Sequence, residues 1–384
     1  MGSKCLVLGL GLLFASAAAA QTFSAGPLLA MSRAGVIVVP LDDAVVAIGG
    51  ENIEGALRSA EILVDGSDHW SFFGRLRVPR VRHTVTPLAD GEMLVAGGGG
   101  AHPQARLAEL WNGDAFVSGG LMLAARNRHA ATLLPDGRVL VTGGRDAHDR
   151  LIAEAELWDP RDHRWHPAGR LRHARCCHSA TALPDGRVLV VAGLIAKPCD
   201  EPGERHCFAS TSDVELWDPK TSRFSIGPSL PEHEDRAAHT ATRLHDGRVL
   251  LAGGAEHDDP DRRRSDFLWT GGKWQPIDDK VFRAYHTATL LPDGKVLAVG
   301  GWRDMCGCCK RLPSRGQGAS MDGPKLFDPA TAKWSYAGGS EWFRARHGAA
   351  GRPDGSVVIV GGESTEWGLS NRIFSSVEIW TPTK

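Results

Sequence analysis

The sequence predicts an all-β fold assembled from seven copies of one unit, and two recurring patterns carry the prediction. An Arg opens every copy, and a His follows three residues later in six of them, since Val36 replaces the first His. Two apolar runs come next, and in six copies an Asp-Gly turn joins them. Asp-Gly between apolar runs is a strong hairpin signal, because this dipeptide tolerates the positive φ of tight turns. The copies start at Arg33, Arg80, Arg126, Arg175, Arg236, Arg283 and Arg344.

Each copy continues with two further strands. A motif such as Ala-Glu-Leu-Trp at Ala108, or its shorter forms Phe-Leu-Trp at Phe267 and Lys-Leu-Phe at Lys325, indicates a third strand, and an aromatic residue such as Trp165 or Trp274 begins the fourth. Four antiparallel strands per unit make one blade of a β-propeller. We therefore expect one seven-bladed propeller domain over residues 21–384.

The two ends of the chain predict how the ring closes. Residues 23–26 precede Arg33 at about the spacing at which a fourth strand precedes the Arg of the next copy, as Trp165 to Gly169 precede Arg175. The seventh copy ends at Trp380-Thr381-Pro382 without a fourth strand of its own. We expect the N-terminal strand to complete the last blade, so that no sheet edge stays open.

Residues 1–20 have the features of a secretory signal peptide. Lys4 precedes an apolar run from Cys5 to Phe14, and small residues follow up to Ala20. This arrangement predicts cleavage after Ala20 and a secreted, periplasmic or cell-surface location. The apolar run is too short to span a bilayer, so we expect no membrane insertion.

The charge balance argues against nucleic acid as a partner. The chain has 44 basic and 45 acidic residues, which leaves no net basic field over the fold. Proteins that bind nucleic acid usually carry a basic patch or stripe.

The repeats resemble those of the kelch β-propellers, a repeat also found in the central domain of galactose oxidase. The spacings between the opening arginines, 46 to 61 residues, fit a kelch repeat of roughly 50 residues. The resemblance covers the whole chain after Ala20. Kelch propellers include copper-radical oxidases, sugar epimerases and many binding scaffolds, so the fold alone does not select a function.

The Arg and His columns open the innermost strand of each predicted blade, which places them near the mouth of the central channel. Two interpretations are open. Either these side chains bond backbone carbonyls and neighbouring blades, or they form a cationic funnel for the carboxylates of a glycan or an acidic peptide. The residues predicted to line the ligand site are Arg126, Arg175, Arg236, Arg283, Arg344, His178, His239, Tyr285 and His286.

Seven cysteines follow Ala20, and all of them fall on the same predicted face of three neighbouring copies. Disulfides are the first expectation in an exported protein. We expect Cys199 to pair with Cys207, and the Cys176-Cys177 pair to bridge to a cluster in the sixth copy, Cys306, Cys308 and Cys309. The alternative is a soft-metal site of copper or zinc, with thiolates and His178, His206 or His239 as ligands.

An oxidase site is a further alternative. Tyr285-His286 resembles the stretch of galactose and glyoxal oxidases that gives a Tyr-His pair to copper, and Cys177 holds the strand position of their crosslinking Cys. Such a site needs a second Tyr, whereas Tyr336 falls on a predicted outer strand. Cys177 and Tyr285 also lie two copies apart, although that crosslink joins neighbouring copies.

A weaker resemblance concerns iron. Asp235 and His239 match part of the Glu, Asp, His spacing of iron-dependent specifier proteins, but Pro231 stands where their Glu would fall. The sequence therefore favours an exported binding scaffold for a protein or a glycan, without a cofactor. The alternative is a metal-dependent oxidase, with copper or iron, or a sugar-epimerase-like enzyme on the same face.

Overall fold

The computed structural model describes residues 21–99, 103–199, 206–257, 264–302, 323–341, 343–364 and 372–383. The predicted signal segment of residues 1–20 and the predicted cluster of Cys306, Cys308 and Cys309 lie outside the described residues. The described part consists of short antiparallel strands, with two short 3-10 helices at Ala89–Gly91 and Pro103–Arg106. In this part, no helix is long and apolar enough to cross a membrane.

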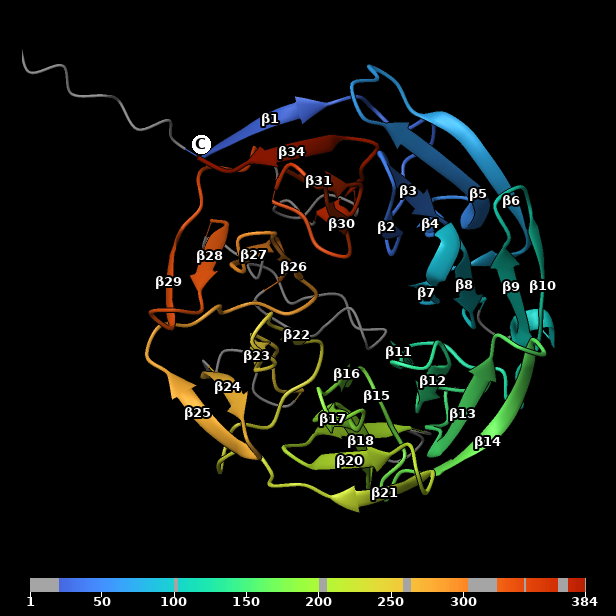
Figure 1. The fold of residues 1–384 in the computed structure, drawn as a ribbon, viewed down its shortest axis with the longest axis vertical. Coiled ribbons are helices and arrows are strands. Elements are labelled where there is room, and N and C mark those ends of the chain that lie inside the picture. The colour runs from blue at the N-terminus through green and yellow to red at the C-terminus, as the bar shows by residue number, and fades with distance from the viewer. Residues whose placement is uncertain are drawn as a thin grey trace, which may run out of the picture.

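The main sheets lie around a common centre (Figure 1). The first holds β2 (Ile37–Leu41), β3 (Ala44–Ile48), β5 (Gly55–Val64) and β6 (Ser71–Arg80), with the short β4 (Glu51–Asn52) paired to β5. The second holds β7 (Thr84–Pro87), β8 (Met93–Ala96), β9 (Leu107–Trp111) and β10 (Phe116–Leu121). The third holds β11 (Ala130–Leu133), β12 (Val139–Thr142), β13 (Glu154–Asp159) and β14 (Arg164–Arg170).

The later sheets repeat this order. They consist of β16 (Ser179–Ala182), β17 (Val188–Val191), β20 (Val214–Asp218) and β21 (Arg223–Ile226); then β22 (Thr240–Arg243), β23 (Val249–Ala252), β24 (Asp266–Thr270) and β25 (Lys273–Ile277). Next come β26 (Thr287–Leu290), β27 (Val296–Val299), β28 (Lys325–Asp328) and β29 (Lys333–Tyr336). The last sheet combines β30 (Gly348–Gly351), β31 (Val357–Val360) and β34 (Val377–Thr381) with β1 (Thr22–Gly26).

The first strand of each sheet is innermost. Neighbouring first strands adjoin in chain order from β2 to β30, and β30 adjoins β2. At the perimeter, β1 lies beside β34 (Figure 1) and pairs with it antiparallel, from Thr22 opposite Thr381 to Gly26 opposite Val377. The N-terminal strand thus takes the predicted place of a fourth strand in the last sheet.

The core lies between the sheets. The second strands, such as β12, β17 and β23, are buried at every residue because both of their faces are covered. Third-strand tryptophans also link neighbouring sheets: Nε1 of Trp158 donates to the carbonyl of Gly119 at 3.1 Å, and Nε1 of Trp217 to that of Ala168 at 2.9 Å. These bonds hold the third strand of one sheet against the fourth strand of the preceding sheet.

The structure differs from the sequence expectation in two places. In most units the first strand begins just after the His, not at the Arg, because the residue before the His has a positive φ that ends strand geometry. The long connection of the fourth unit forms a hairpin of β18 (Leu194–Lys197) and β19 (Cys207–Ser210), which adds to β15 (Arg175–Cys176). A smaller hairpin, β32 (Glu363–Ser364) with β33 (Arg372–Ile373), follows β31.

Candidate binding site at the inner rim

The repeated arginines are buried between the sheets. Arg126 is 1% exposed, and its Nη1 donates a hydrogen bond of 2.7 Å to the carbonyl of Gly143. The same bond, to the carbonyl 16 or 17 residues further along the chain, recurs in every unit; the other acceptors are Gly49, Gly97, Ala192, Gly253, Gly300 and Gly361. Each Arg therefore ties the start of its first strand to the end of its second.

A glutamate on the third strand pairs with the Arg in five units. Arg175 Nη2 lies 2.8 Å from Glu215 Oε1, and the other Oε of this carboxylate accepts the backbone N–H of Arg172 at 2.9 Å. The corresponding pairs are Arg33 with Glu61, Arg80 with Glu109, Arg126 with Glu156, and Arg344 with Glu378. Buried ions need a partner with good geometry, which explains why Arg and Glu recur together in the sequence.

The fifth and sixth units lack this glutamate. Phe267 takes its place in the fifth, where the guanidinium carbon of Arg236 lies 5.5 Å from the centre of the Phe267 ring and Nη2 pairs with Glu234 at 2.5 Å. Lys325 takes its place in the sixth, and Arg283 Nη2 donates to the carbonyl of Gly323 at 2.7 Å.

The histidine column is buried as well, apart from the half-buried His239. Nε2 of His178 lies 2.8 Å from the hydroxyl of Thr142, and Nε2 of His239 lies 2.8 Å from that of Ser179. His286 bonds Thr240 in the same way at 3.0 Å. Burial, together with the charge of the neighbouring Arg, lowers the pKa of His178 and His286 to about 3. These rings are therefore neutral and connect adjacent sheets.

The structure thus places the predicted ligand residues Arg126, Arg175, Arg236, Arg283, Arg344, His178, His239 and His286 in contacts within and between sheets. This is the first of the two interpretations that the sequence left open. A role of these residues in ligand binding stays a prediction.

A different residue of each repeat faces its counterpart in the next sheet. The residue two positions after the Arg has φ between +52° and +62° in all seven units, the left-handed region that residues with a Cβ rarely adopt. We call these seven residues the inner rim: Gly35, Arg82, Arg128, Cys177, Ala238, Tyr285 and Arg346. Left-handed non-glycine residues concentrate at functional sites, so the inner rim is the candidate site.

A chain of backbone hydrogen bonds joins the inner rim. The N–H of Arg128 donates to the carbonyl of Arg82 at 3.1 Å, and the N–H of Cys177 to that of Arg128 at 3.2 Å. The series continues with donors Ala238, Tyr285, Arg346 and finally Gly35, whose N–H reaches the carbonyl of Arg346 at 2.7 Å. Direct contact between successive units places these residues at the innermost edge of the sheets.

The inner-rim side chains divide into three sectors. Arg82, which is exposed, and the half-buried Arg128 are the basic sector. The second, or aromatic, sector holds the half-buried Cys177 and Tyr285 on either side of Ala238, and the ring of Tyr285 lies edge-on to Trp302, with 6.0 Å between ring centres. In the third sector, Arg346 is paired on both sides.

The carboxylates of the third sector come from the connections after the second strands. Arg346 Nη1 lies 3.0 Å from Glu363 Oε1, and its Nη2 pairs with Glu51. These partners raise the pKa of Arg346, although burial opposes them. The charge of Arg346 is therefore balanced by two carboxylates within the fold.

The predicted disulfide between Cys199 and Cys207 is present, and it closes a loop with a sequence separation of 8. His206 is exposed beside it, whereas His178 is buried, His239 is half-buried, and both are bonded to hydroxyls. The three predicted metal ligands are therefore not brought together. Among the residues that the structure describes, no three His, Cys, Asp or Glu side chains form a group suited to a metal ion.

The copper-radical arrangement fits the described residues poorly. His286 turns its Nε2 to Thr240 inside the fold, and Tyr336 lies on the outer strand β29 with 67% of its surface exposed. On the inner rim, Ala238 stands between Cys177 and Tyr285. These positions do not assemble two tyrosines, two histidines and a cysteine around one point.

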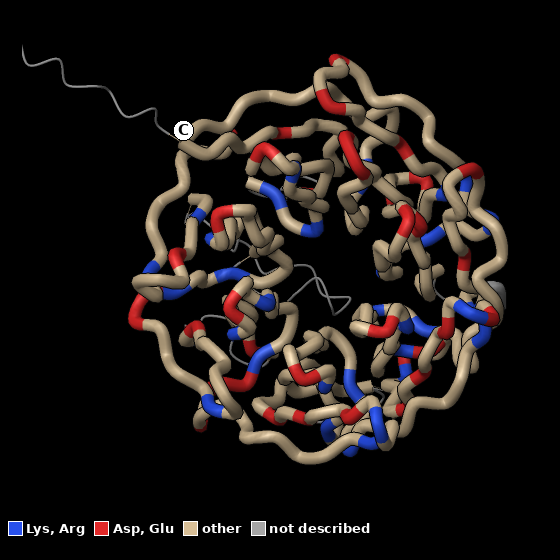
Figure 2. Tube along the Cα trace, viewed as in Figure 1, with Lys and Arg blue, Asp and Glu red and all other residues tan. Residues whose placement is uncertain are grey.

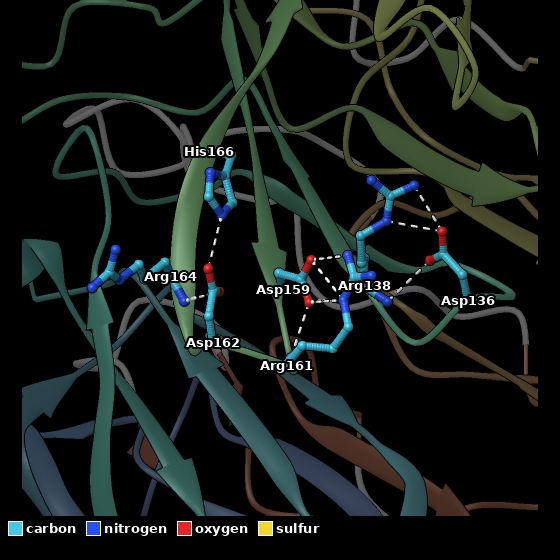
Figure 3. A network of polar contacts seen from close by, with 7 residues as sticks. All are labelled: Asp136, Arg138, Asp159, Arg161, Asp162, Arg164 and His166. Carbon is cyan, nitrogen blue, oxygen red and sulfur yellow. Dashed lines mark hydrogen bonds and ion pairs between the residues drawn. The ribbon is translucent and has the colours of Figure 1, made fainter.

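The opposite ends of the strands carry ion pairs in which at least one partner is exposed. Figure 3 shows those of the third unit, where Arg161 Nε lies 2.9 Å from Asp159 Oδ1 and Arg138 Nη2 lies 2.7 Å from Asp136 Oδ2. The hydrogen bond from Arg161 is the main cause of the lowered pKa of Asp159. Charges of both signs occur on every part of the ring (Figure 2), as the near-neutral sequence predicts.

Comparisons with known proteins support the fold more than an activity. No family model matches the chain. Over 71 residues it is 35% identical to the influenza virus NS1A-binding protein of Homo sapiens and to its Mus musculus homolog. This match covers 18% of this chain and 11% of each relative, so the chain aligns with a small part of their length.

A solved structure gives a longer match. It is a fungal alcohol oxidase of the AA5 family in complex with copper, with a TM-score of 0.69 and 16% identity over 94% of this chain and 76% of that chain. Identity this low supports a common fold and no shared activity. Together, the two comparisons and the repeated antiparallel sheets support, at a coarse level, a kelch-like propeller fold.

Proposed function

We propose that the protein is an exported binding scaffold that recognises an anionic ligand, carried by a protein or a glycan, at the inner rim. The fold we infer for this role is a closed seven-bladed propeller whose signal segment, residues 1–20, is removed on export. The supporting observation is the chain of inner-rim hydrogen bonds, which sets Arg82 and Arg128 on the same rim as Tyr285 of the aromatic sector, with Cys177 and Ala238 between Arg128 and Tyr285.

The two sectors suit different parts of one ligand. Guanidinium groups form paired hydrogen bonds with carboxylates, so Arg82 and Arg128 favour an acidic group. Tyr and Trp offer rigid apolar surface with a polar tip, which is why they are common where proteins meet ligands. The name of the NS1A-binding relatives, which refers to binding of a protein, is consistent with a scaffold role.

The experiment is calorimetric titration with two acidic probes, polygalacturonate and poly-glutamate, each against a neutral polymer of similar size. We expect an acidic probe to bind, and the double variant Arg82→Gln/Arg128→Gln to weaken that binding at least tenfold. Arg161→Gln is the matched control, since its side chain is 81% exposed at the far end of the strands. Equal affinity of the double variant and the control, or no binding of either acidic probe, would reject the proposal.

The alternative of a metal-dependent enzyme rests on the copper-bound structural neighbour. Metal analysis of the protein purified without chelator separates the two functions. A copper or iron content near one per chain that survives dialysis would favour the enzyme, whereas a content near zero would favour the scaffold.

A further inference from the structure

Arg145 is a buried cation that no carboxylate in the described part of the chain neutralises. It follows the Gly143-Gly144 turn, is 4% exposed, and has no hydrogen-bond partner for Nη2. Its Nε lies 3.1 Å from Cys176 Sγ, and its guanidinium carbon lies 4.1 Å from the centre of the Phe208 ring. The repeated arginines, by contrast, satisfy their charge with glutamates or carbonyls. A buried charge is costly without a counter-charge, so Arg145 requires a nearby anion.

Two adjacent sulfurs are placed to supply that anion. Cys176 Sγ lies 3.4 Å from Cys177 Sγ, and Nη1 of Arg128 lies 4.0 Å from the second sulfur. Cys176 is fully buried, whereas Cys177 belongs to the inner rim and is half-buried. Two cations from two preceding segments therefore face the pair, one at each sulfur.

Other described elements that pack around the pair contribute apolar side chains or charges that are already balanced. The hairpin β18–β19 contributes the apolar Leu194 and Phe208. In the segment of the pair itself, Arg175 forms an ion pair with Glu215. Burial and the charge of Arg175 lower the pKa of His178 to about 3, so that this ring is neutral. Burial lowers the pKa of Arg145, but the charges of Cys176 and Cys177 outweigh it and raise the pKa overall. The surroundings thus favour a thiolate at these sulfurs.

We propose that Cys176 and Cys177 form a thiol–disulfide exchange site for disulfide substrates, with Arg145 as the residue that positions and stabilises the thiolate. Cys177, the more accessible sulfur, attacks one sulfur of the substrate disulfide. The substrate S–S bond breaks, its second sulfur leaves as a thiolate and takes up a proton, and a mixed disulfide remains on Cys177.

Cys176 completes the exchange. Its sulfur attacks Cys177 Sγ from a separation of 3.4 Å and closes to an S–S bond of about 2.05 Å. The first substrate sulfur leaves as a second thiol. The cysteine pair is oxidised by two electrons, and the substrate disulfide is reduced to two thiols, so the substrate itself is the oxidant.

The test uses the mature protein, reduced and desalted, with a dipyridyl disulfide that releases one coloured thiopyridone for each exchange. We expect a fast phase at neutral pH that releases two equivalents of thiopyridone per chain. Its rate should be at least tenfold higher than the rate at which glutathione reacts with the same reagent. Mass spectrometry should assign the product to a Cys176–Cys177 disulfide. A fast phase that maps to other cysteines, or a rate no faster than that of glutathione, would overturn the proposal. The rate and the disulfide assignment are both measured on the protein without substitutions, so the test does not depend on whether a variant folds.

Variants separate the roles of the three residues. Cys176→Ser should release one equivalent and stop at a mixed disulfide on Cys177. Arg145→Met should slow the fast phase about tenfold and Arg145→Lys should restore most of the rate, whereas a purely structural Arg would show no rescue by charge. Arg161→Met, at the far end of the strands, is the control. An unchanged rate in folded Arg145→Met would contradict the role given to Arg145.

Discussion

Arg80 and Glu109 form an ion pair in which neither side chain has any exposed surface. Nη2 and Nε of Arg80 lie 2.8 and 3.0 Å from Glu109 Oε1, and Oε2 accepts the backbone N–H of Arg77 at 2.7 Å. One carboxylate thus holds both the Arg and the segment that leads to it. The pair is a structural joint, repeated with other residues in four further units.

Removal of Glu109 should leave an uncompensated buried cation. We expect Glu109→Ala to lower the free energy of unfolding by about 3–5 kcal/mol, measured by urea denaturation. Asp136→Ala is the control, because its pair with Arg138 is solvent-exposed and exposed pairs contribute about 0–1 kcal/mol. Equal losses in the two variants would show that Arg80 finds another partner.

The turn after the second strand should not accept a side chain. Gly97 has a φ of +64°, and a Cβ on it would lie 2.4 Å from the carbonyl oxygen of Arg126 and 2.5 Å from Cε1 of His129. Gly113 has a φ of +95° and nothing within 4 Å of such a Cβ. Both Gly→Ala variants strain the backbone by about 1–2 kcal/mol. Gly97→Ala should lower the free energy of unfolding by about 1–3 kcal/mol more than Gly113→Ala, because the sheets must move apart to admit the Cβ. Equal urea midpoints of the two variants would refute this close approach.

The buried histidines predict loss of stability in acid. Burial and the adjacent Arg hold the pKa of His178, His286 and His347 at about 3, below the value of about 6.5 expected in the unfolded chain. Their contribution to the free energy of unfolding is therefore complete above pH 6.5 and is lost as the pH falls toward 3. Each such His removes about 1.4 kcal/mol per pH unit in this window.

One group works in the opposite direction. Burial raises the pKa of Asp266 to about 6, so its contribution is complete below its ordinary range and is lost as the pH rises through 6. The histidines outnumber it. We expect the urea midpoint to fall steeply from about pH 6.5 to 4.5, and His286→Gln to make that fall shallower. A midpoint that stays level over this interval would contradict the buried, neutral state of the column.

The sequence predicted the repeat, the strand order and the N-terminal strand because these follow from local patterns: Asp-Gly turns, alternating apolar runs and recurring third-strand motifs. The Arg–Glu pairs could also have been predicted, since Glu61, Glu109, Glu156, Glu215 and Glu378 recur at one position of that motif. The inner rim could not. Its members share a backbone conformation and not a residue type, so only Gly35 gives a local sign of the positive φ.

The cysteine face was predicted in part for the same reason. Cys199 and Cys207 are close in sequence, and their disulfide follows from the short loop between them. The contact of Arg145 with Cys176 joins two units, and it depends on how one sheet packs on the next. No spacing in the sequence encodes that packing, whereas the buried position of Arg145 reveals it directly.

The N-terminal strand provides the last prediction. The signal segment predicts that the mature chain starts at Gln21, which leaves β1 whole, because its pairing with β34 begins at Thr22. A chain that starts at Pro27 would lack β1 and expose the edge of β34, and open edges pair with other chains. We expect this truncation to aggregate and to lower the melting temperature, while removal of Thr383 and Lys384, which follow β34, does neither. N-terminal sequencing of the exported protein and light scattering of both truncations check the two parts. A monomeric, equally stable chain without residues 21–26 would mean that β1 does not support the last sheet.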